Sequence, residues 1–174
     1  MKRILLCVLV LLMAFSALAE KARRAPDVIL QDLSGKKHKL DDFLGEEAVL
    51  LNFWATWCKP CLAELPQIEK FHEQWEERGL TLLTVCIDDP RTQKQVKPFV
   101  KRHGFQFPVY TDPNQKALRM MGGRGVPYNV LIAPDGRMLD LQTGFPPKTV
   151  KRWEALLEKE LPALSVPEDK SREN

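Results

Sequence analysis

Histidine and cysteine are scarce in this 174-residue sequence, which contains three of the former and four of the latter. The histidines, His38, His72 and His103, stand far apart, and the C-x-x-C pair at Cys58 and Cys61 has no second pair to complete a zinc site. We therefore expect no metal and no cofactor. An excess of charge is also missing, because 26 Lys and Arg face 23 Asp and Glu without a basic cluster. That balance argues against a nucleic-acid partner.

The sequence also lacks a hydrophobic run long enough to span a bilayer, which takes about 20 residues. The apolar run Ile4 to Phe15 follows two basic residues and precedes a small-residue stretch that ends at Ala19, which is the pattern of an export signal. We expect residues 1–19 to be a cleaved signal peptide and the mature protein to be periplasmic or otherwise extracytoplasmic. The alternative is an uncleaved signal that anchors the protein to the inner membrane.

Three cysteines remain after signal removal, because Cys7 leaves with residues 1–19. An odd number in an exported protein cannot form a closed set of disulfides. Cys58 and Cys61 are separated by two residues, which indicates a redox pair, whereas Cys86 stands alone inside an apolar run. Free cysteine is among the most often buried residue types, so we expect Cys86 to act as a small hydrophobic side chain.

Hydrophobic periodicity divides residues 20–161 into alternating strands and helices, without a composition break that would mark a second domain. The expected strands are 28–33, 37–40, 48–55, 81–87, 107–110, 128–133 and 138–143, and the expected helices are 58–79, 93–103, 114–121 and 148–161. Such alternation is typical of a central sheet with helices on both faces. Pro98 is expected to kink its helix. The polar residues 162–174 are expected to be disordered.

The motif Trp57-Cys58-Lys59-Pro60-Cys61 lies where a buried strand gives way to a helix. A helix N-terminus has unsatisfied N–H groups and a partial positive charge, which stabilise a thiolate. We expect Cys58 to be exposed and to attack a partner disulfide, and Cys61 to be shielded one turn inside and to resolve the mixed disulfide. The alternative is an inert structural disulfide.

A resemblance to a known family rests on the stretch Phe53-Trp54-Ala55-Thr56-Trp57-Cys58-Lys59-Pro60-Cys61. It resembles the active-site signature of thioredoxin-fold proteins and is most similar to the extracytoplasmic TlpA/ResA/DsbE group. The resemblance covers about residues 26–161 and implies an α/β, thioredoxin-like fold over residues 20–161. That fold has a central mixed β-sheet flanked by helices, an N-terminal β-hairpin around Ser34-Gly35, and an extra helix inserted in the middle of the domain, in Asp89 to His103.

The resemblance also implies roles for residues near the cysteine pair. Gly125-Val126-Pro127 resembles the loop whose cis-proline faces the cysteines, where the backbone of Val126 would bind an extended substrate. Trp57 is expected to shield the pair and, with Val126 and Pro127, to contact substrate. Most X-Pro bonds are trans, so the expected cis bond at Pro127 depends on the family pattern and on the strand 128–133 that follows it.

Glu64 is the acidic residue that this group uses, and it lies three residues, or about one helical turn, after Cys61. We expect its carboxylate to take or hold the proton of the buried thiol. The alternative is an ordinary exposed helix glutamate. Asn52 departs from thioredoxin itself, which has a buried acid at that position.

The sequence thus predicts an exported thiol–disulfide oxidoreductase that exchanges disulfides with client proteins through Cys58 and Cys61. A reducing direction is expected, because a carboxylate near Cys61 disfavours a second negative charge. The resemblance implies an upstream membrane electron donor and a task such as cytochrome c maturation or related envelope thiol reduction. One alternative is a peroxiredoxin-like peroxidase, whose Pro-x-x-x-Thr/Ser-x-x-Cys loop is missing. Another is a copper or cytochrome-assembly binding module, which would use C-x-x-x-C and a distant histidine.

Overall fold

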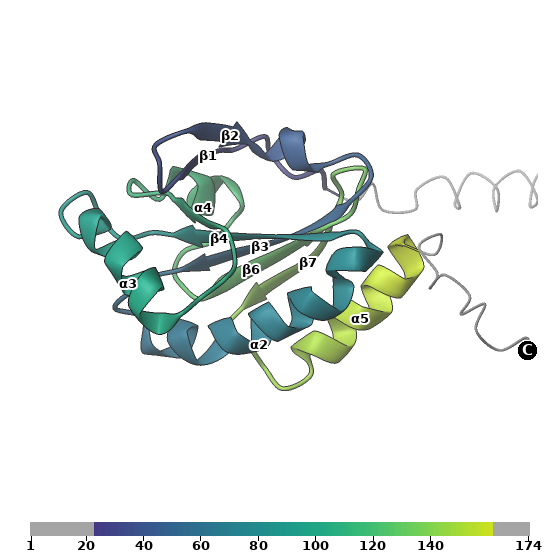
Figure 1. Cartoon of the computed structure of the whole chain (residues 1–174). Helices are drawn as coiled ribbons and strands as arrows, with labels where there is room; N and C mark the ends of the chain where they lie inside the picture. Colours follow the sequence, from purple (N-terminus) through teal and green to yellow (C-terminus); the bar gives the residue numbers. More distant parts are fainter. Residues whose placement is uncertain (1–22, 162–174) are drawn as a thin grey trace, which may run out of the picture.

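The computed structural model describes residues 23–161, so the expected signal peptide and the polar tail 162–174 lie outside the described part. The described residues form a seven-stranded sheet in the order β2-β1-β5-β4-β3-β6-β7 (Figure 1). The strands are β1 (Ile29–Asp32), β2 (Lys37–Lys39), β3 (Ala48–Trp54), β4 (Leu80–Cys86), β5 (Val109–Thr111), β6 (Tyr128–Ile132) and β7 (Met138–Thr143). The pairs β3–β4 and β4–β5 are parallel and the other pairs are antiparallel, so the sheet is mixed, as expected.

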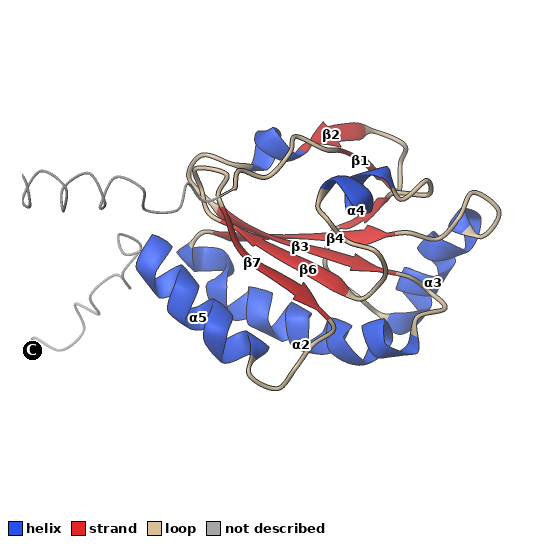
Figure 2. Cartoon of the chain, turned by 180° about the vertical axis from the view of Figure 1, so that it is seen from behind, coloured by secondary structure: helices blue, strands red, loops and turns tan. Residues whose placement is uncertain are grey.

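Helices cover both faces of this sheet (Figure 2). The α-helices are α2 (Lys59–Trp75), α3 (Val96–His103), α4 (Lys116–Met120) and α5 (Thr149–Glu160), and the 3-10 turns are η1 (Leu40–Phe43), η2 (Glu76–Arg78) and η3 (Gln93–Gln95). The long helices α2 and α5 lie on one face and α4 lies on the other, while α3 lies beyond the end of the sheet at which β4 ends (Figures 1 and 2). No helix in residues 23–161 has both the length and the apolar content needed to cross a membrane.

The core forms where apolar strands meet one face of α2. All seven residues of β3 are buried, which is typical of a central strand covered on both faces. The buried side chains of α2 include Leu65, Ile68 and Phe71, whose spacing of three residues keeps them on one stripe of the helix. The Phe71 ring lies 5.6 Å from the buried Trp153 ring of α5, so both long helices share one core with the sheet.

The expected strands and helices all occur, with their ends shifted by a few residues. The N-terminal hairpin is present, and the extra helix is divided into η3 and α3. Pro98 lies in the first turn of α3, where its missing N–H removes no bond within that helix, and the expected helix 93–103 changes from a 3-10 turn to an α-helix two residues before it. The helix after the cysteine pair ends at Trp75 and continues as η2 up to Gly79, whose φ of 87° favours glycine.

Candidate active site

The strand order brings three loops to one edge of the sheet. Trp54 at the end of β3 pairs in parallel with Cys86 at the end of β4, so the residues that follow these two strands leave the sheet together. On the other side, Phe53 pairs antiparallel with Tyr128, the first residue of β6. The cysteine pair, the residues after β4 and the loop before β6 therefore meet at the same place.

Cys58 and Cys61 form a disulfide at the start of α2, with an S–S distance of 2.04 Å and a Cα–Cα distance of 5.3 Å. Cys58 is the N-cap residue of the helix, and its Sγ accepts a hydrogen bond of 3.2 Å from the Cys61 N–H. Cys61 is buried with 0% exposure, as expected. The expectation that Cys58 is exposed is wrong for this oxidised form, because its sulfur is bonded inward across the first turn and the residue is only 5% exposed.

The loop before β6 contains a cis peptide bond between Val126 and Pro127, which confirms the expectation based on the family pattern. A hollow of about 470 Å³ joins this loop to Pro60, which lies between the cysteines. Its lining residues are Pro60, Ala63, Glu64, Gln67, Pro127, Thr143, Gly144 and Phe145. The expected substrate-binding residue Trp57 is 61% exposed, whereas Trp54 is a buried core residue, so Trp57 is accessible to a partner.

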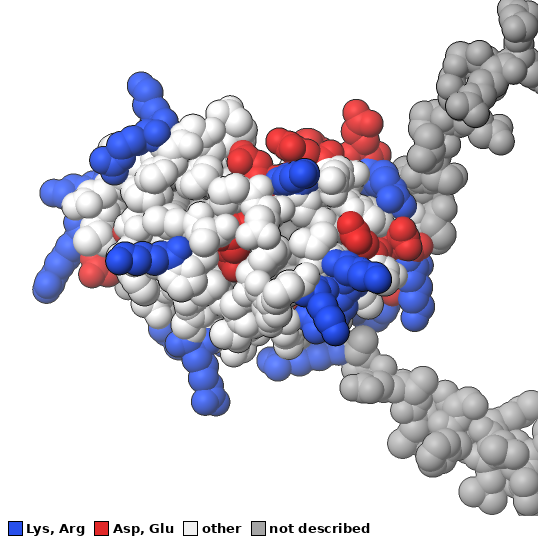
Figure 3. All heavy atoms as spheres, turned by 90° about the horizontal axis from the view of Figure 1, so that it is seen from below, with Lys and Arg blue, Asp and Glu red and all other residues white. Residues whose placement is uncertain are grey.

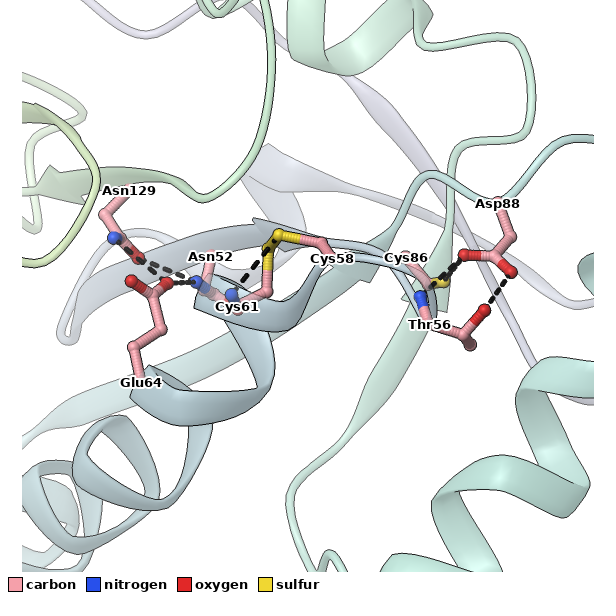
Figure 4. Close-up of a disulfide and its surroundings, with 8 residues drawn as sticks. All are labelled: Asn52, Thr56, Cys58, Cys61, Glu64, Cys86, Asp88 and Asn129. Atoms are coloured by element: carbon pink, nitrogen blue, oxygen red, sulfur yellow. Dashed lines mark hydrogen bonds between the residues drawn. A yellow bond between two sulfur atoms is a disulfide. The ribbon is translucent and has the colours of Figure 1, made fainter.

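Glu64 is not an ordinary exposed helix residue, because only 2% of it is accessible to solvent. Its Oε1 accepts hydrogen bonds from Asn52 Nδ2 at 2.9 Å and from Asn129 Nδ2 at 3.5 Å. Asn52 Nδ2 also donates to Asn129 Oδ1 at 2.8 Å, and the two residues are direct partners across β3 and β6. Figure 4 shows this group on one side of the disulfide, with the Glu64 carboxyl turned toward both asparagines.

Burial raises the pKa of Glu64 from 4.5 to about 7, while the hydrogen bonds from Asn129 and Asn52 act in the opposite direction and are weaker than the burial effect. The two partners are uncharged amides, which cannot stabilise a carboxylate as a cation would. The second oxygen, Oε2, has no hydrogen-bond partner among residues 23–161 and is therefore available to carry a proton. Glu64 can thus exchange a proton near neutral pH.

The asparagine pair is a part of the site that the sequence analysis missed. The sequence pattern presents Asn52 only as the replacement of an acid and gives Asn129 no role. Asparagine is depleted from β-strands, and both residues are buried in otherwise apolar strands. That conflict between residue type and position was the available signal.

Cys86 is free and fully buried, as expected. Burial raises the pKa of its thiol well above its ordinary value, so the thiol stays protonated and unreactive. Its Sγ donates to Asp88 Oδ1 at 3.2 Å, and Asp88 also binds Thr56 in the loop before Cys58. The sequence gives no signal for Asp88 beyond its place directly after the expected strand 81–87. Within residues 23–161, no group of three or more His, Cys, Asp and Glu side chains could hold a metal ion.

Comparisons with known proteins agree with this geometry. The sequence profile of the AhpC/TSA family matches residues 22–140. The thiol–disulfide oxidoreductase ResA of Bacillus thuringiensis (strain Al Hakam) is 36% identical over 140 residues, which cover 80% of this chain and 78% of the relative. The ResA protein of Geobacillus thermodenitrificans (strain NG80-2) is 36% identical over 120 residues, which cover 69% of this chain and 67% of that protein.

A solved structure from Chlorobium tepidum, assigned as a thiol:disulfide interchange protein DsbE, has a similar fold. It superposes with a TM-score of 0.72 at 29% identity, over 82% of this chain and 98% of that chain. The mixed sheet, its helices and this similarity together show a thioredoxin-like fold. With its C-x-x-C disulfide at the start of α2, the chain belongs to the AhpC/TSA family and, within it, is a thiol–disulfide oxidoreductase related to ResA.

Proposed function

We propose that this protein reduces disulfides of client proteins outside the cytoplasm, with Cys58 as the nucleophile and Cys61 as the resolving thiol. The observation that carries the proposal is the Cys58–Cys61 disulfide at the N-terminus of α2, with Glu64 buried one turn further along the same helix. This arrangement provides a nucleophile at a helix terminus and a proton acceptor behind the second thiol.

The exchange proceeds in two displacements. The Cys58 thiolate attacks one sulfur of a client disulfide, and the other client sulfur leaves as a thiolate and takes up a proton. The Cys61 thiol then transfers its proton to Glu64 and attacks Cys58 Sγ, so that the client leaves with its second sulfur reduced. Two electrons have passed to the client, and the enzyme holds the Cys58–Cys61 disulfide. A membrane dithiol donor restores the two thiols by the reverse sequence.

The hollow beside Pro60 supports the contact with clients. Its lining is mainly apolar or uncharged and includes both Pro60 and Pro127. The backbone of Val126, before the cis-proline, can pair with an extended client segment. On the face that Figure 3 shows, Asp and Glu gather toward one end while Lys and Arg project from both ends. We assign client binding to the hollow and to the exposed Trp57.

The groups around the sulfurs support the proposed reducing direction. Groups that stabilise the thiolate stabilise the reduced form of the protein. Where such groups are few or weak, the protein is more reducing. Among residues 23–161, Cys58 Sγ accepts one hydrogen bond, from the Cys61 N–H, and Pro60 has no N–H to add a second. Glu64 opposes a negative charge on Cys61 whenever it is ionised. Against these stand the helix N-terminus and Lys59, whose exposed ammonium group is screened by solvent.

Export rests on the sequence of residues 1–19, which has the form of a cleaved signal peptide. We propose that the client task belongs to envelope thiol reduction, of which cytochrome c maturation is one example. An oxidising compartment would return the pair to the disulfide state, so the membrane dithiol donor is required for turnover.

Substitution of the two cysteines should assign nucleophile and resolver. In Cys61→Ser, a client attacked by Cys58 cannot be released, so a mixed disulfide should accumulate. In Cys58→Ser, adducts should be absent because Cys61 is fully buried. Non-reducing gels and mass spectrometry of the envelope fraction measure both, with Cys86→Ser as the matched control. Equal trapping by the two variants would contradict the assignment.

The role of Glu64 predicts a pH-dependent resolving step. When the reduced protein reacts with an aromatic disulfide reagent in a stopped-flow instrument, the first coloured thiolate reports attack by Cys58 and the second reports resolution by Cys61. The second phase should accelerate as pH rises through about 7, where Glu64 becomes a proton acceptor. Glu64→Gln should slow that phase about a hundredfold, the low end of what a positioned general base contributes, and spare the first phase.

The control is Glu73→Gln, which removes the same charge from an exposed site on α2. It should change neither phase. A second phase in Glu64→Gln with the wild-type rate and pH profile would remove Glu64 from the mechanism, while leaving the two-cysteine exchange intact.

The direction of exchange is measured by a redox titration against glutathione. We expect a reduction potential nearer about −270 mV, the thioredoxin value, than about −120 mV, the DsbA value. A potential above about −180 mV, the range of disulfide isomerases, would make the protein an oxidant or isomerase. That outcome would overturn the direction but not the nucleophile.

A further inference from the structure

Asp88 is a buried carboxylate that the exchange cycle does not use. It follows β4 by two residues and is fully buried. None of the ion pairs within residues 23–161 involves it. Burying a carboxylate without a cation raises the free energy of the folded state unless hydrogen bonds compensate for the lost water. The hydrogen-bond donors to Asp88 therefore indicate its structural role.

Two of its three hydrogen bonds come from one residue in the loop between β3 and α2. The Thr56 N–H donates to Asp88 Oδ1 at 2.9 Å, and the Thr56 hydroxyl donates to Oδ2 at 2.6 Å. The third bond comes from the Cys86 thiol. Figure 4 shows Asp88, Thr56 and Cys86 on the side of the disulfide opposite Glu64. Asp88 therefore holds both the backbone and the side chain of Thr56.

Thr56 precedes Cys58 by two residues, and the rest of this loop is held by backbone contacts. Ile87 N–H donates to the Trp54 carbonyl at 2.8 Å, and Cys58 N–H donates to the Ala55 carbonyl at 3.1 Å. Between these contacts Thr56 is only half-buried and Trp57 is mostly exposed, so little apolar burial fixes the middle of the loop. Asp88 supplies the polar anchor at that point.

We propose that Asp88 is a positioning residue for Cys58. By holding Thr56 through two hydrogen bonds, it keeps Cys58 at the N-cap position of α2, where the sulfur accepts the Cys61 N–H. In the reduced protein that position stabilises the Cys58 thiolate. The proposal concerns the reactivity of the thiol itself and does not depend on the direction of exchange or on the client.

Geometry and charge can be separated at this site. In Asp88→Asn the amide oxygen can still accept from the Thr56 N–H and the Cys86 thiol, and the amide N–H can donate to the Thr56 hydroxyl. Asp88→Ala loses all of these bonds. Thr56→Val loses only the hydroxyl bond, at a half-buried position, whereas Thr56→Ser keeps it. The charged residues of α2 nearest the pair, Lys59 and Glu64, are unchanged in every variant.

The experiment measures alkylation of Cys58 in the reduced full-length protein by iodoacetamide between pH 5 and 9, with peptide mapping to identify Cys58. In Thr56→Val and Asp88→Ala the rate at pH 6 should fall about tenfold and the profile should move up by about one pH unit, because a cysteine displaced from a helix N-terminus loses thiolate stabilisation. Thr56→Ser, Asp88→Asn and Cys86→Ser should stay within about twofold of wild type.

Three outcomes would overturn the proposal. Equal profiles in Thr56→Val and Thr56→Ser would show that the hydroxyl bond does not matter to the reactivity of Cys58. A loss of reactivity in Asp88→Asn equal to that in Asp88→Ala would assign the effect to the charge of Asp88 and not to its hydrogen bonds. A loss in Cys86→Ser equal to that in Thr56→Val would assign it to packing around Asp88. If Asp88→Ala does not fold, as thermal melting would reveal, the Thr56→Ser and Thr56→Val pair decides.

Discussion

The placement of β3 between β4 and β6 is the constraint on which the site depends. Because β4 runs parallel to β3, the residue that anchors the active-site loop follows β4 at the edge where Cys58 begins α2. Because β6 runs antiparallel, Pro127 and Asn129 lie at that same edge. A slip of one residue in either pairing would turn these side chains to the other face of the sheet and dismantle the site.

Two buried carboxyl groups flank the disulfide, and their partners differ. Glu64 is bound by two amides across the β3–β6 pair, and its Oε2 has no partner in the part of the chain that the structure describes, so it is suited to exchange a proton. Asp88 uses both of its oxygens to accept hydrogen bonds from neighbouring groups, so it is suited to hold a loop in place. We propose that carboxyl groups serve proton transfer on one side of the cysteines and positioning on the other.

The sequence was sufficient for those features that depend on local pattern. The apolar runs predicted the strands, and the C-x-x-C motif at a strand-to-helix junction predicted the disulfide. The cis bond at Pro127 was available only through family resemblance, since local sequence favours trans. Asn52 and Asn129 are 77 residues apart and meet only through strand register, which single-sequence patterns do not give. The burial of Cys58 was mispredicted because it depends on where the disulfide turns the sulfur.

Titration of the Glu64 carboxyl in the oxidised protein tests the proposed proton transfer most directly. Carbon-13 labelling and NMR detect the carboxyl, and Glu64→Gln assigns its signal. We expect a titration midpoint of about pH 7, because the carboxyl group is buried and its hydrogen-bond partners are uncharged amides. A midpoint near the ordinary value of 4.5 would show that Glu64 is ionised throughout the neutral range. It would then hold no proton in the oxidised state, and its proposed part in the exchange would be contradicted.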